Sequence, residues 1–212
     1  MMDFLRALTI GKRKGRVFDV ETLTQAVAEG AAYLAQGASY SYIRARSGTM
    51  GPRLMQDADF GRGMERCKWE GFAACAQDLI LIIENRLRPH LAPGRRAPAD
   101  LWRDLYRDVL AGQEMPAHRR HKGWTDRIAE FDNRLARHLA AAPAPIEEIA
   151  THSGEVIMEF APVEEAIRRF DRAMVVNNVR FRFIDQVTEL CGRIDWEALA
   201  RDIAAAGERP TP

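Results

Sequence analysis

The chain has 212 residues, of which 47% are hydrophobic and 29% are charged, a composition that is ordinary for a globular protein. Its 31 basic and 30 acidic residues nearly cancel, so the net charge of +1 gives no bulk attraction for nucleic acid, and no nucleic-acid partner is expected. No apolar run approaches the roughly 20 residues that a membrane-spanning helix needs. The three cysteines, Cys67, Cys75 and Cys191, all fall in apolar helical patterns, which is typical of reduced packing residues in the cytoplasm.

Residues 1–18 form an N-terminal segment in which a short apolar stretch is followed directly by a basic cluster. Apolar side chains that enter the lipid, beside cations that are held by anionic headgroups, make a weak interfacial anchor. The segment therefore predicts contact with the anionic cytoplasmic face of the inner membrane. The alternative is a short helix packed on the protein beside a solvated basic loop. The predicted membrane-contact residues are Met1, Phe4, Leu5, Leu8, Lys12, Arg13, Lys14 and Arg16.

Residues 19–207 are predicted to form a single helical domain, because their apolar spacing is helical and shows no sustained alternation of the kind found in strands. The fold class is all-α, an irregular bundle of about six helices, followed by a loose tail at 208–212. The long helices are predicted near 20–46, 59–87 and 162–191, with shorter ones at 99–111, at 125–142 and from about 195 to 206, and weak pieces between 146 and 160. Asp19 or Thr22 is the predicted cap of the first long helix and Asp195 that of the last, and Pro162 is placed in a first helical turn.

The helix at 59–87 is predicted to be the centre of the fold, because its second half is apolar nearly all round. Asp78 is the charge that interrupts this apolar surface. A buried carboxylate needs a cation or several hydrogen-bond donors, since leaving it unpaired costs more than ordinary packing supplies. The sequence therefore predicts a partner for Asp78.

A polar notch interrupts the helix at 162–191, because Asn177 and Asn178 stand where its apolar stripe should continue. The stripe predicted to face inward is Val163, Ile167, Phe170, Met174 and Phe181. If the two long helices pack nearly antiparallel, the notch meets Asp78, with Arg180 or Asn178 as its partner. This arrangement predicts either a satisfied network that fixes helix register or a ligand pocket. Its candidate residues are Asp78, Asp171, Asn177, Asn178, Arg180 and Asp185.

No motif for a metal, a nucleotide or a serine nucleophile is evident. None of the five histidines lies in a His-Glu-x-x-His arrangement, and the chain has no Walker loop or dinucleotide fingerprint. The stretch 37–41 matches half of G-x-S-x-G, but it falls inside a predicted helix, whereas the nucleophile elbow needs a strand-to-helix turn. We predict no metal and no cofactor.

Three stretches are distinctive when they are taken together. They are Arg44 to Thr49 with Pro52; Cys67-Lys68-Trp69 followed by Ala73-Ala74-Cys75 and Asp78-Leu79; and Phe170-Asp171 with Asn177, Arg180 and Phe181. In these residues the chain resembles a group of uncharacterised bacterial helical proteins that often carry the label esterase. The resemblance spans most of the chain and implies an all-helical fold, but it attaches no chemistry to these motifs, and the label conflicts with the serine positions.

These observations predict a non-catalytic helical binding or scaffolding protein that acts on a protein partner and is peripheral at the inner membrane. The alternative is an enzyme or small-molecule-binding protein with a polar pocket between the two long helices at Asp78, Asn177 and Asn178. The sequence leaves the oligomeric state open.

Overall fold

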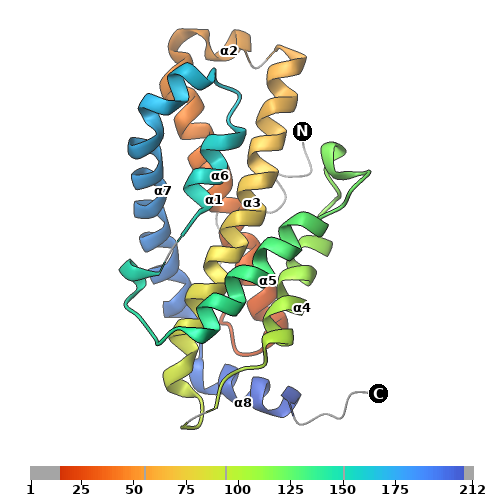
Figure 1. Ribbon diagram of the computed structural model, residues 1–212, viewed down its shortest axis with the longest axis vertical. Helices are drawn as coiled ribbons and strands as arrows, with labels where there is room; N and C mark the ends of the chain where they lie inside the picture. Colours follow the sequence, from red (N-terminus) through yellow and green to blue (C-terminus); the bar gives the residue numbers. More distant parts are fainter. Residues whose placement is uncertain (1–14, 55, 94, 150, 208–212) are drawn as a thin grey trace.

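The computed structural model describes residues 15–54, 56–93, 95–149 and 151–207, and over these residues the chain is an all-α bundle without strands, which confirms the predicted class (Figure 1). One isolated bridge joins Val17 to Ile194. The helices are α1 (Val20–Ser47), α2 (Gly51–Leu54), α3 (Ala58–Leu87), α4 (Ala99–Ala111), α5 (Thr125–Ala140), α6 (Ser153–Phe160), α7 (Glu165–Arg193) and α8 (Trp196–Gly207).

Helix α3 is the centre of the fold, as predicted. It runs through the middle of the molecule, with α6 and α7 on one side and α4 and α5 on the other, while α1 crosses behind it and contacts both α7 and α4 (Figure 1). Every residue from Cys67 to Asn85 is buried, because the apolar run in its second half has neighbours all round. Gly71 permits the close approach of α6, since a Cβ there would lie 2.9 Å from Cγ1 of Ile157. Each large aliphatic side chain buried in this way contributes about 1.5–3 kcal/mol.

Local capping signals explain where several helices begin. Asp19 caps α1 by accepting a 2.8 Å hydrogen bond from the backbone N–H of Thr22, and Asp195 caps α8 through the N–H of Ala198 at 3.1 Å. The predicted place of Pro162 is wrong, because α7 begins three residues later at Glu165. Helix α6 begins at Ser153, within the stretch 146–160 for which the sequence predicted only weak helical pieces.

Helix α7 buries the face opposite to the predicted one. Its buried residues are Asp171, Val175, Val179, Phe183, Gln186, Val187 and Leu190. These side chains pack α7 onto α1 and α6. The inward stripe predicted for this helix is wrong, because Ile167, Phe170, Met174 and Phe181 are all exposed. The sequence of α7 carries two parallel stripes, and the one with the larger apolar side chains faces outward.

The predicted membrane contact falls almost entirely outside the described residues. Met1, Phe4, Leu5, Leu8, Lys12, Arg13 and Lys14 all lie there, as does the predicted tail at 208–212. Arg16 is described; its exposed side chain lies 3.2 Å from Oδ2 of Asp195. No helix in the described part of the chain is both long and apolar enough to cross a bilayer.

Candidate functional site

Asp78 finds a complete set of partners, but they are not the predicted ones. Arg134 of α5 donates to its Oδ1 at 2.5 Å, and the backbone N–H groups of His152 and Ser153 donate to its Oδ2 at 3.1 and 3.0 Å. Nδ1 of the His152 ring lies 3.2 Å from Oδ1. The side chain of Asp78 is thus fully bonded where α5 and the start of α6 meet α3. The prediction that a partner must exist is confirmed.

The residues of the predicted notch do not meet Asp78. Asn177, Asn178, Arg180 and Asp185 are exposed on α7, which packs mainly on α1 and α6. The amide oxygen of Asn178 accepts a 3.1 Å hydrogen bond from Arg182. A buried polar network or ligand pocket that joins these four residues to Asp78 is therefore a wrong prediction, because the outward face of α7 was taken for its inward face.

Asp171 is buried, but it belongs to a separate cluster with two residues of α1. Its carboxylate accepts hydrogen bonds from Nε of Arg46 at 2.5 Å and from the Tyr42 hydroxyl at 3.0 Å, and both donors lie on α1. The hydrogen bond from Arg46 is the main cause that lowers the pKa of Asp171. These hydrogen bonds hold the N-terminal part of α7 against α1.

Two further carboxylates on α3, Glu70 and Glu84, have partner sets like that of Asp78. Glu70 accepts from Nε of Arg119 at 2.7 Å and from Nε of Arg127 at 2.9 Å, and its Oε1 lies 2.9 Å from Nε2 of His118. Each of the three carboxylates therefore lies beside at least one arginine and one histidine. We call these groups the carboxylate clusters.

The third cluster surrounds Glu84, near the C-terminal end of α3. Nε of Arg88 lies 2.8 Å from its Oε2, and Nε2 of His138 lies 2.8 Å from the same oxygen. Between the clusters, Gln77 donates to the Arg127 carbonyl at 3.0 Å and accepts from Arg134 at 2.9 Å. Helix α5 is thus bonded to α3 along most of its length.

In each carboxylate cluster the acid is held in its ionised form beside its cations. Burial raises the pKa of Asp78, but Arg134, His152 and the Ser153 amide outweigh it and bring the pKa down to about 2. The pKa values of Glu70 and Glu84 are lowered by their cations against burial in the same way. A catalytic acid at neutral pH needs the opposite shift, toward the working pH. The clusters are therefore arranged to hold helices together, and sequence reasoning missed two of the three.

The serines do not form a hydrolase site. His152 has a carboxylate partner in Asp78, but its Nε2 lies 3.3 Å from Glu130, not beside a serine hydroxyl. Ser39 is buried with its Oγ 3.5 Å from the sulfur of Cys67, and Ser41 accepts from Arg182 at 2.8 Å. In the described part of the chain no serine hydroxyl is hydrogen-bonded to a histidine ring, as nucleophile activation would require.

The outer side of α7 presents a stripe of large apolar side chains. Phe170 is 75% exposed, Phe181 72% and Met174 59%. Monomeric proteins rarely expose contiguous apolar patches of this kind unless they bind something. We call this stripe the α7 face; its members are Ile167, Phe170, Met174, Phe181 and Ile184, with Asn177 in the middle.

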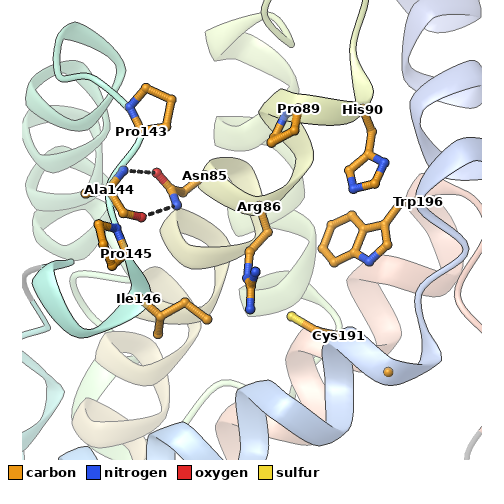
Figure 2. Close-up of a pocket in the computed structure, with 11 residues that line it drawn as sticks. Asn85, Arg86, Pro89, His90, Pro143, Ala144, Pro145, Ile146, Cys191 and Trp196 are labelled. Atoms are coloured by element: carbon orange, nitrogen blue, oxygen red, sulfur yellow. Dashed lines mark hydrogen bonds between the residues drawn. The ribbon is translucent and has the colours of Figure 1, made fainter.

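A groove of about 780 Å³ lies between the end of α3, the link from α5 to α6, and the junction of α7 with α8. Figure 2 shows the side chain of Arg86 reaching into its middle, with Ile146 on one side and Trp196 on the other. The His90 ring stacks on Trp196 with the ring centroids 5.4 Å apart. The groove has the size and mostly apolar lining of a small-molecule site, roughly 300–1,000 Å³. Its other lining residues are Asn85, Pro89, Pro143, Ala144, Pro145, Cys191 and Gly192.

Within the described residues, no group of histidine, cysteine or acidic side chains is placed to hold a metal ion. The histidines of the carboxylate clusters each lie beside an arginine, which would repel a metal cation. Comparison of the chain with protein-family models, with curated proteins and with solved structures finds no match.

Proposed function

We propose that this chain is a non-catalytic helical binding protein that docks a protein partner on the α7 face. The observation that carries the proposal is the exposure of Phe170, Met174 and Phe181 on a helix whose opposite side is already packed in the core. Exposed aromatic and methionine side chains are the ones enriched at protein interfaces.

The proposal extends to the place where this binding occurs. We place the protein in the cytoplasm, with residues 1–16 in contact with the anionic inner surface of the membrane. The free thiols at Cys67, Cys75 and Cys191 support the compartment, because disulfides form in oxidising compartments. The basic cluster that ends at Arg16 supports the membrane contact.

A photo-crosslinker placed in the α7 face tests the docking site. With p-benzoylphenylalanine in place of Phe181 in the full-length chain, irradiation of cells is expected to give one dominant protein adduct. The matched control is the same residue in place of Met115, which is 40% exposed away from α7. Adducts that are equally abundant at both positions, or absent at both, would contradict the proposal.

A second candidate function is small-molecule binding in the groove, and Arg86 is the observation that favours it. In the described part of the chain, Arg86 has no ion pair or hydrogen bond, although it points into a groove with apolar walls. An unpaired guanidinium beside Trp196 suits an organic anion, such as a carboxylate or sulfonate with a flat apolar body.

Isothermal titration with 1-naphthoate tests this candidate. Saturable binding to the wild-type protein is expected, and Arg86→Met should weaken it by roughly tenfold or more, because a charge-assisted hydrogen bond contributes about 1.5–3 kcal/mol. Arg137→Met is the control, since Arg137 is exposed on α5 and, among the described residues, bonds only the Asn133 carbonyl. Equal affinity in Arg86→Met, or no binding at all, would remove this candidate.

A further inference from the structure

The residues of the α7 face have a regular spacing along the sequence, and this spacing is evidence that is separate from their exposure. Ile167, Phe170, Met174, Asn177, Phe181 and Ile184 are separated by three, four, three, four and three residues. Alternation of three and four is the repeat with which one helix forms a continuous seam with another. All of these residues except Asn177 are apolar, and Asn177 stands near the centre of the seam.

The seam lies on the side of α7 that faces away from its own bundle. The buried series from Asp171 to Leu190 packs on α1 and α6, and helical rotation places the seam on the opposite side of the helix. Figure 1 shows the upper part of α7 at the edge of the molecule, next to α1 and α6, with the link between α5 and α6 beside its lower part. The seam is most exposed from Phe170 to Phe181, whereas Ile184 at its C-terminal end shares a small pocket with Ile146 and Ile149 of that link.

We infer that the α7 face is covered by a second copy of this chain, with the two α7 helices paired in parallel and in register about a twofold axis. This inference rests on the proposed function, in which the α7 face binds a protein, and it names that protein. A twofold pair uses the same patch on both copies, so the patch must be complementary to itself.

The seam meets this condition when it is paired with its own copy. In a parallel pair each residue faces its equivalent, so that Phe170 lies against Phe170 and Phe181 against Phe181. The two Asn177 amides then meet and can hydrogen-bond each other, whereas an antiparallel pair would place each of them opposite Met174. A single asparagine in such a seam fixes register and direction at some cost in affinity.

The charges beside the seam agree with a parallel pair. Arg180 and Asp185 stand on opposite edges of it, at positions that come close across a parallel pair of helices. The edge also carries the small residues Ala166 and Ala173, which do not obstruct the approach.

The area is close to what a specific dimer needs. Two phenylalanines exposed by about three quarters and three partly exposed aliphatic side chains present on the order of 500 Å² of apolar surface. A twofold pair would bury about twice this before any flanking polar surface is counted, which approaches the roughly 1,200–2,000 Å² of a standard interface.

Sedimentation equilibrium of the full-length protein tests the association. A reversible dimer is expected at micromolar concentration, and Phe181→Glu should raise its dissociation constant on the order of 30-fold. Asn177→Leu should tighten it, because the polar residue is removed from the seam. Met115→Glu, an equally drastic change of an exposed side chain outside α7, should leave it unchanged. A wild-type protein that stays monomeric overturns the inference.

A cysteine substitution tests the direction. Under mild oxidation, Ile184→Cys should form a disulfide-linked dimer, because equivalent residues meet in a parallel pair, whereas an antiparallel pair holds them roughly 25 Å apart. Arg172→Cys, on the same helix but outside the seam, should not form one. Absence of the disulfide in an otherwise dimeric Ile184→Cys protein overturns the parallel register. A monomer that still gives a specific heterologous adduct at Phe181 in cells overturns the dimer and leaves the proposed function standing.

Discussion

Replacing Glu70 with glutamine is expected to lower the free energy of unfolding by roughly 3–5 kcal/mol, the cost of removing one partner from a buried ion cluster. Arg119 is only 1% exposed and would keep Asp126 as its one carboxylate, while Arg127 would keep Glu130. Two guanidinium groups would thus lose the acid that they share. Chemical denaturation followed by circular dichroism measures the loss.

Glu29→Gln is the matched control for this substitution. Glu29 is exposed on α1, so the same chemical change there should alter stability by no more than about 0.5 kcal/mol. If the two variants unfold at the same denaturant concentration, the Glu70 cluster does not contribute to the free energy of folding. In that case the role assigned to the carboxylate clusters is wrong.

The features of the fold that local sequence controls could be predicted. The start of α1 follows from Asp19 and Thr22, which bond each other's backbone within one turn. The central place of α3 follows from its second half, which is apolar on nearly all sides and so cannot have a face in contact with water. Helix α4 was predicted with its observed bounds, 99–111, because its amphipathic pattern is uninterrupted.

The buried face of α7 could not be predicted from its own sequence. Both of its stripes have helical spacing, and the outward one carries the larger apolar side chains. The choice between them depends on other helices: Arg46 and Tyr42 of α1 bond Asp171, and Gly30 leaves room for Gln186. The exposed placement of Asn177, Asn178, Arg180 and Asp185 follows from that choice.

The partner of Asp78 lies 56 positions away on α5, so helix-by-helix reasoning from apolar stripes could not identify it. A signal was nevertheless present. Glu70, Gln77 and Glu84 are spaced by seven residues on α3, and Arg127 and Arg134 are spaced by seven on α5. Matching seven-residue series of acids or amides and of arginines predict that two helices pack with these faces together.

Replacing Asp78 with asparagine is expected to cost roughly 3–5 kcal/mol at pH 7, because Arg134 and His152 lose the acid between them. The melting temperature should fall by roughly 6–20 °C for a chain of this length.

The destabilisation caused by Asp78→Asn should also depend on pH. The pKa of Asp78 is lowered from 3.8 to about 2 in the folded protein. Its ionised form therefore contributes stability above about pH 4, by about 2 kcal/mol, and this is lost as the pH falls toward 2.

The wild-type protein should accordingly lose stability between pH 4 and about pH 2, and Asp78→Asn should lose less over the same interval. The loss persists in part, since the pKa of Glu130 is also lowered to about 2, first by its hydrogen bond with His152. Asp108→Asn, on the exposed side of α4, should reproduce the wild-type pH profile. An Asp78→Asn protein with wild-type stability at pH 7 would show that the network is not needed for folding, and would return Asp78 to the set of candidate binding residues.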